Sequence, residues 1–147
     1  MTNPRNRELA GQWLAKADRD LLTVRRMSEG PDAPLDIVCF HAQQAAEKAL
    51  KAVLVAHDVT PERTHDVLLL LDAVVQYVPA LDAEAQNLGA MTDFAIRVRY
   101  PGTLGDPSRE TATSAGQTAR RVHAAAKAHI EELSKTEDEP EEEEDQE

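Results

Sequence analysis

The sequence predicts an all-helical fold, an up-and-down bundle of four to five helices. Alanine is abundant and glycine is limited to six residues, a composition typical of helices. Aromatic residues make up only 3% of the chain, whereas β-sandwiches and barrels depend on aromatic and β-branched residues in their strands. Five segments repeat apolar residues at helical spacing, and a length of 147 residues suits one domain.

The first two helices are predicted on either side of a strong stop signal. The first runs from about Arg5 to Met27, with apolar residues at alternating spacings of four and three. Residues 29–34 (EGPDAP) combine a glycine with two prolines, which end a helix. The second helix starts near Asp36, an expected N-cap, and continues to about His57. We expect it at the centre of the bundle, because a seam of small residues admits a close neighbour: Val38, Ala42, Ala45, Ala49 and Ala52.

The third helix is predicted from a short, strongly apolar segment. It begins at Asp66, with its cap near residues 64–65, and Pro79 ends it. Residues 67–71 are all apolar and would also suit a buried strand. The helical period of the segment and its helical surroundings favour a helix.

The fourth and fifth helices are separated by a loop containing glycine and proline. The fourth covers roughly residues 80–98 and stops at the Tyr-Pro-Gly of residues 100–102. Asp106 followed by Pro107 suits the N-cap and first turn of the fifth helix. Its apolar seam is unbroken: Ala112, Ala115, Ala119, Val122, Ala126, His129 and Leu133. Helices joined by short loops pack antiparallel, hence the predicted up-and-down order.

Charge divides the chain into a body and a tail. Of the net charge of −11, residues 135–147 carry −8 and residues 1–134 carry −3. An acidic run repels itself and cannot bury apolar surface. We therefore expect one helical domain over residues 1–134 and a disordered acidic tail over residues 135–147. The tail either serves solubility or competes with nucleic acid for the arginines of the body.

Several kinds of site are excluded by what the sequence lacks. A single cysteine, Cys39, allows no internal disulfide and no multi-cysteine zinc site, and we expect it to be a small buried residue. There is no phosphate-binding glycine loop, serine elbow or zinc signature, so we predict no metal and no cofactor. No basic-then-apolar leader opens the chain and no apolar run approaches 18 residues, which predicts a cytoplasmic protein without a membrane span.

The second helix carries the most informative polar pattern. His41, Gln44 and Lys48 lie on one stripe opposite the small-residue seam, and Lys51 continues it. An imidazole, an amide and two ammonium groups in line can hold a phosphate or a sugar. A solvated helix face with a Glu47–Lys51 pair explains the same pattern, and spacing alone favours that alternative.

Two further groups are candidate site residues. His65 beside Asp66 can form an orienting pair in catalysis, although Asp66 can simply cap the helix. Arg97 and Arg99, followed by Tyr100, lie at a helix end, where arginines complement the negative pole or bind a phosphate bidentately. Two other arginine pairs are interpreted as surface residues: Arg25–Arg26 and Arg120–Arg121.

Together these motifs resemble the HEPN domain family, whose members are small all-helical prokaryotic proteins and domains of some larger eukaryotic proteins. Four segments carry the resemblance over about residues 9–132: 13–21 (WLAKADRDL), 40–52 (FHAQQAAEKALKA), 64–67 (THDV) and 97–101 (RVRYP). The alanine-rich HAQQAAEK sequence is the specific part. The resemblance implies a dimeric up-and-down bundle, often encoded beside a minimal nucleotidyltransferase, in a setting like that of toxin–antitoxin pairs.

The chain departs from the RNase toxins of that family, which use an arginine followed four to six residues later by a histidine. No histidine occupies that window after Arg97 or Arg99, and the arginines of the last helix lack one at that spacing. The chain therefore resembles the Arg-Tyr-Pro branch. For this branch, the resemblance implies nucleotide or partner binding.

We expect a non-catalytic or weakly catalytic protein that binds a nucleotide or nucleic-acid phosphate. The expected site residues are His41, Gln44 and Lys48 on one wall, closed by His65, Arg97, Arg99 and Tyr100. One alternative is a metal-independent RNase in which His41 or His65 supplies acid–base chemistry and Arg99 steadies the phosphate. The other is a dimerisation scaffold without a ligand.

The expected assembly is a C2 homodimer, the commonest closed symmetry among soluble oligomers. The small-residue seam of the second helix and the long seam of the last helix offer more apolar surface than one small bundle needs to bury.

Overall fold

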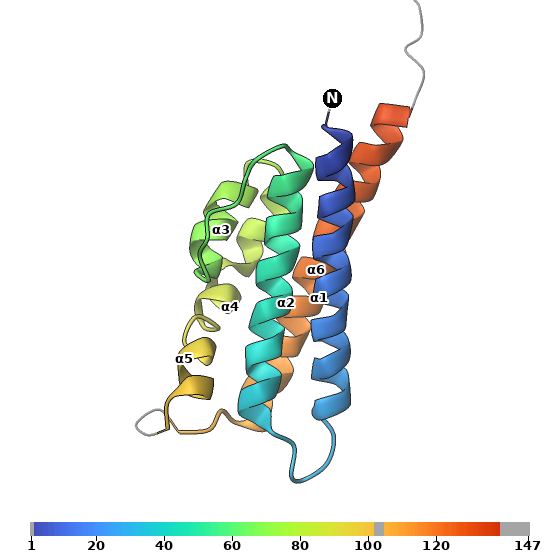
Figure 1. Ribbon diagram of the computed structural model, residues 1–147. Helices are drawn as coiled ribbons and strands as arrows, with labels where there is room; N and C mark the ends of the chain where they lie inside the picture. Colours follow the sequence, from blue (N-terminus) through green and yellow to red (C-terminus); the bar gives the residue numbers. More distant parts are fainter. Residues whose placement is uncertain (1, 102–104, 139–147) are drawn as a thin grey trace, which may run out of the picture.

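Three long helices run side by side through the molecule (Figure 1): α1 (Pro4–Met27), α2 (Leu35–Ala56) and α6 (Arg109–Asp138). Shorter segments lie along one side of α2: α3 (Val67–Val74), the 3-10 helix η1 (Pro79–Glu84), α4 (Ala85–Gly89) and α5 (Phe94–Arg99). This computed structural model describes residues 2–101 and 105–138, and these ranges contain no strand. The predicted all-helical up-and-down bundle is confirmed. Within the same ranges, no helix combines the length and apolarity needed to cross a membrane.

The start of α1 is fastened to the end of α2. Asn3 caps α1, since its side-chain oxygen accepts a hydrogen bond from the Arg5 N–H at 3.0 Å. The Asp58 carboxylate accepts from the Asn6 side chain at 2.9 Å and from the Asn3 N–H at 3.1 Å. These two hydrogen bonds, that from Asn6 first, lower the pKa of the Asp58 carboxyl. The two helices are therefore antiparallel neighbours.

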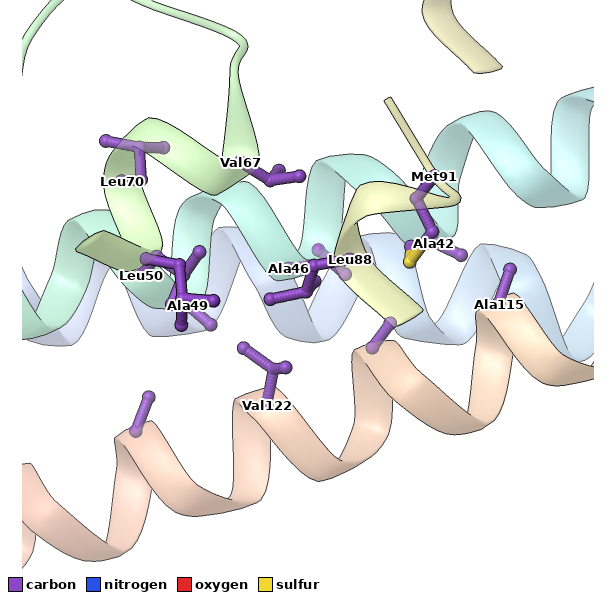
Figure 2. Packing of buried hydrophobic residues seen from close by; sticks show 14 of the residues in the cluster. Ala42, Ala46, Ala49, Leu50, Val67, Leu70, Leu88, Met91, Ala115 and Val122 are labelled. Atoms are coloured by element: carbon purple, nitrogen blue, oxygen red, sulfur yellow. The ribbon is translucent and has the colours of Figure 1, made fainter. Parts of the chain in front are cut away.

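The small residues of α2 form the centre of the core. This helix packs against α1, α6, α3 and α5. Ala46 and Ala49 are fully buried and share one apolar cluster with Leu88 and Val122 (Figure 2). The whole predicted seam is buried: Val38, Ala42, Ala45, Ala49 and Ala52. The predicted central position of this helix is therefore confirmed, and Cys39 is buried beside it as expected.

Residues 67–74 form a helix and not a strand, as predicted, but Asp66 is its N-cap and not its first residue, so the cap lies after the expected residues 64–65. The helix ends at Val74, before the predicted stop at Pro79. The predicted continuous helix over residues 80–98 is wrong, because η1, α4 and α5 divide this segment. Thr92 Oγ1 donates a hydrogen bond to the Gly89 carbonyl at 2.9 Å and so competes with the helical ladder. Breaking the helix lets apolar side chains along the whole segment reach the core, and this burial outweighs the tendency to continue one helix. These buried side chains are Leu81, Leu88, Met91 and Phe94.

Both ends of α6 differ from the sequence prediction. Ser108, and not Asp106, caps its start, because Ser108 Oγ accepts from the Thr111 N–H at 3.0 Å. At the other end, the predicted domain boundary after residue 134 falls inside α6. Glu137 accepts from the Thr2 N–H at 2.8 Å and forms an ion pair with Arg7, so this last turn contacts the start of α1. Residues 139–147 of the predicted tail lie outside the described residues.

The seams that were expected to form a dimer interface are packed within one chain. The alanines of α2 are buried, as are Ala112, Ala119 and Val122 of α6. Neither seam therefore leaves the surplus apolar surface on which the dimer prediction depended. Among the residues that the structure describes, the large apolar side chains that stay exposed lie elsewhere: Leu9, Leu22, Met27, Val59, Leu68, Leu69 and Tyr100. The homodimer stays a prediction, without support from the two seams.

Two histidines connect the end of α2 to α6. His57 Nε2 and His129 Nε2 are 2.8 Å apart, and the Tyr77 ring stacks on His57 at a centroid distance of 3.9 Å. One ring must donate and the other accept, so the contact is lost when both imidazoles are protonated. Burial lowers the pKa of both histidines, and the neighbouring His129 lowers that of His57 further.

We expect acid to destabilise this contact. Because both pKa values are lower in the folded chain than the ordinary value of 6.5, the unfolded chain binds more protons below that pH. The stabilisation is complete above pH 6.5 and is lost as the pH falls through the folded-state pKa values. In His129→Gln, the free energy of unfolding in urea should therefore fall less between about pH 7.5 and about pH 5 than in the parent. Lys127→Gln, on the exposed side of α6, is the control, and an equal fall in all three proteins would contradict the prediction.

The tight core around α2 yields a second prediction. Ala49 is fully buried, so Ala49→Leu should lower the free energy of unfolding by about 1–3 kcal/mol through overpacking. The matched change Ala15→Leu, on the exposed side of α1, should change it by no more than about 0.5 kcal/mol. Urea unfolding of both variants measures the difference. Similar values for the two variants would show that α2 does not sit in a close-packed core.

Candidate functional site

The polar face of α2 lies between α1 and the loop that leads to α3. Gln43, Glu47 and Lys51 are only 1%, 3% and 8% exposed. The expected Glu47–Lys51 pair is present, with Lys51 Nζ 4.0 Å from Glu47 Oε1. Of the predicted stripe, Lys51 is therefore buried and not solvated, whereas His41, Gln44 and Lys48 are half-buried. The buried charges of Glu47 and Lys51 require partners.

One carboxylate of α1 joins two of the predicted site residues. Asp20 Oδ1 is 2.9 Å from His41 Nδ1, and Asp20 Oδ2 is 2.6 Å from Lys48 Nζ. Asp20 is 7% exposed, and the Lys48 ammonium neutralises its charge. The hydrogen bond places the proton of the His41 ring on Nδ1, and Nε2 bonds to no described residue. His41 is thus oriented by a carboxylate with its second nitrogen available.

A second carboxylate, from α2 itself, holds His65. Glu47 Oε1 is 2.7 Å from His65 Nδ1, and Gln43 Nε2 donates to the His65 carbonyl at 3.2 Å. Lys51 Nζ, which faces the same Glu47 oxygen, lies 5.5 Å from the centre of the Trp13 ring. The side chain of Glu47 is 4% exposed, whereas that of His65 is 71% exposed. His65 is therefore held at its Nδ1 edge while most of its ring faces solvent.

Helix geometry explains why these groups meet. Trp13 and Asp20 are seven residues apart and share one face of α1. Because α1 and α2 are antiparallel, Trp13 meets Lys51 while Asp20 meets Lys48, nearer the start of α2. Asp66 is not the partner of His65, since its Oδ1 accepts from the N–H groups at the start of α3. The interpretation of Asp66 as a cap is confirmed.

The other predicted site residues are not drawn into these contacts. Gln44 is half-buried and bonds to no described residue. Arg99 and Tyr100, at the end of α5, are exposed, and within the described ranges neither bonds to Asp20 or Glu47. Arg97 is part of α5, but its side chain lies outside what the structure describes. The closing role of this segment stays a prediction.

Sequence reasoning missed both carboxylates that organise the face. Asp20 lies three residues after Ala17 and four before Val24, both buried, so it borders the apolar seam of α1. An acid in that position needs a partner, and this signal could have identified it. For Glu47, spacing indicated only Lys51, and no local pattern links it to a histidine 18 residues away.

The charges of this face balance when the imidazoles are neutral. Two carboxylates, Asp20 and Glu47, face two ammonium groups, Lys48 and Lys51. Each protonated imidazole adds one positive charge, and histidine is the side chain that changes charge near neutral pH. The arrangement can therefore hold an anion when protonated and can exchange protons at Nε2.

Comparison with known proteins places the chain among helical relatives. A family model described as HEPN domain matches residues 10–130. The crystal structure of TT1696 from Thermus thermophilus is similar, with a TM-score of 0.72 and 25% identity. That of ST0689, an archaeal HEPN homologue, has a TM-score of 0.64 and 24% identity. Each comparison covers 82% of this chain and 97% of the other. No curated protein matches the sequence.

The Asp20 contacts predict a measurable loss of stability. Asp20→Asn removes the charge shared by His41 and Lys48 at a largely buried site, so the free energy of unfolding should fall by about 1–3 kcal/mol. Adding Lys48→Met should cost little more, because the two changes remove the same ion pair. Asp72→Asn, exposed on α3, is the control. Strictly additive losses in urea unfolding would contradict the coupling.

Proposed function

The chain belongs to the HEPN domain family, and we propose that it binds the phosphate of a nucleotide or nucleic acid on the polar face of α2. One observation carries the proposal: His41 and Lys48 converge on the buried Asp20 carboxylate, and Glu47, the residue before Lys48, holds a second imidazole. Groups that are already fixed in place lose little conformational entropy when a ligand binds.

The carboxylates orient the cationic groups in this proposal. Asp20 holds the Lys48 ammonium and the His41 ring beside each other, so neither must search for its position. Protonation of His41 and His65 makes the face positive, which favours a phosphate. Gln44 is assigned to the same wall as His41 and Lys48, and Arg97, Arg99 and Tyr100 close the site, where arginine would bind the phosphate bidentately.

The proposed partners are a second copy of the chain and a minimal nucleotidyltransferase, in a toxin–antitoxin-like setting. The family resemblance supports both. The exposed apolar side chains of Leu68 and Leu69 on α3 are suited to contact a protein partner. The missing arginine–histidine spacing of the RNase toxins favours a binding role over an enzymatic one.

A metal-independent RNase is the second candidate, favoured by the two carboxylate-oriented imidazoles. In that reaction one imidazole, His41 or His65, accepts a proton from the attacking hydroxyl. The other returns a proton to the leaving oxygen, while Arg99 steadies the phosphate. A dimerisation scaffold without a ligand is the third candidate and expects neither binding nor cleavage.

Binding of adenosine monophosphate and of a short fluorescent RNA tests the proposal. Lys48→Ala, His41→Ala and Arg99→Ala should each weaken binding by about 1–3 kcal/mol, the scale of a charge-assisted hydrogen bond. Lys135→Ala, an exposed lysine near the end of α6, removes the same charge away from the site and should leave affinity unchanged. Urea unfolding of each variant confirms that the fold is intact.

Binding and cleavage together separate the three candidates. RNA cleavage without added metal, abolished by His41→Ala or His65→Ala, would favour the RNase. Folded variants that bind like the parent would overturn the proposed site.

A further inference from the structure

A second group of charged residues lies on the other flank of α1. Asp20 of α1 faces α2, whereas Asp18, two residues earlier, faces α6. Between α1 and α6, which run side by side in Figure 1, there is an open groove with a cavity of about 280 Å³. Its lining residues are Asp18, Leu21, Leu22, Arg25 and Arg120.

Two arginines from different helices share this groove. Arg25 of α1 and Arg120 of α6 are exposed, and neither forms an ion pair with a described residue. The Arg120 guanidinium lies over Gly116, where a Cβ would be 3.6 Å from Arg120 Nη1, an ordinary contact, and 3.2 Å from Val24 Cγ1 of α1, a close one. Gly116 therefore allows α6 to approach Val24 of α1 closely beside the Arg120 side chain. Two guanidinium groups around one cavity repel each other, and a bound anion relieves that repulsion.

The acid that lines the groove offsets only one of the two arginine charges. Asp18 Oδ1 lies 2.9 Å from His123 Nε2 of α6. His123 is 8% exposed, and the orientation leaves this nitrogen without a well-directed hydrogen bond. With a neutral imidazole, the lining therefore carries one net positive charge, from Asp18, Arg25 and Arg120 together.

We propose that this groove binds the phosphate group of a nucleotide or nucleic acid between Arg25 and Arg120. Planar guanidinium groups bind phosphate bidentately, and here no described carboxylate holds them. Leu21 and Leu22 form an apolar wall beside the cations, and Leu22 is 42% exposed. Such a wall suits the sugar or base attached to the phosphate. The site is separate from the α2 face and does not depend on it.

The test uses the full chain and follows the methyl resonances of Leu21 and Leu22 by NMR. The probes are inorganic phosphate, adenosine monophosphate and a short RNA. Arg25→Gln and Arg120→Gln should each weaken binding at these resonances about tenfold or more. Arg26→Gln removes the same charge from the next residue of α1, outside the groove lining, and should change affinity less than about twofold.

Each outcome supports or overturns the proposal. Adenosine monophosphate or RNA binding more tightly than inorganic phosphate supports the role of the leucine wall, and comparison of the first two identifies the source of the phosphate. Methyl resonances that no probe shifts overturn the site, as does an equal loss in Arg26→Gln. Lys48→Ala removes a charge of the α2 face only, so failure there leaves the groove resonances responsive and the two proposals distinguishable.

Discussion

The close packing of the three long helices, α1, α2 and α6, is the constraint on which two features depend: the polar face of α2 and the charged groove between α1 and α6. Ala45, Ala49 and Ala52 are fully buried, so the neighbouring helices approach α2 more closely than larger side chains would allow. At this separation the short Asp20 side chain reaches both His41 and Lys48. Where α6 meets α1, a Cβ on Gly116 would lie 3.2 Å from Val24 Cγ1, so the glycine allows a close approach there too.

Because the charged side chains of α2 are buried, each of them needs an oppositely charged or hydrogen-bonding partner. Glu47 and Lys51 are almost fully buried, and removing charged groups from water is costly unless each is paired. The pairs offset this cost and add orientation, because Glu47 holds His65 and Asp20 holds His41. The polar face is therefore a set of fixed groups and not a row of mobile side chains, which suits recognition better than stability.

Helix α1 supplies a carboxylate to each of its neighbours. Asp20 faces the polar side of α2 and Asp18 faces His123 of α6, because residues two apart lie on nearly opposite sides of a helix. The net charge differs between these two surroundings. Around Asp20 and Glu47 the lysines neutralise the acids, whereas the arginines beside Asp18 exceed it by one charge.

The sequence by itself determined the helical class, the approximate limits of α1 and α2, the central place of α2 and the Asp66 cap, because periodicity and capping act within a few residues. The expected Asp36 cap is wrong, since Pro34 holds the cap position and Asp36 lies in the first turn of α2. It also identified His41 and Lys48 as neighbours on one face. The tertiary structure decided the division of residues 80–98 and the length of α6, where contacts from distant helices outweigh local pattern. It alone decided the ion pairs between different elements, since Asp20 and His41 are 21 residues apart. A helical period assigns a residue to a face, but only packing determines which residue of another element meets it.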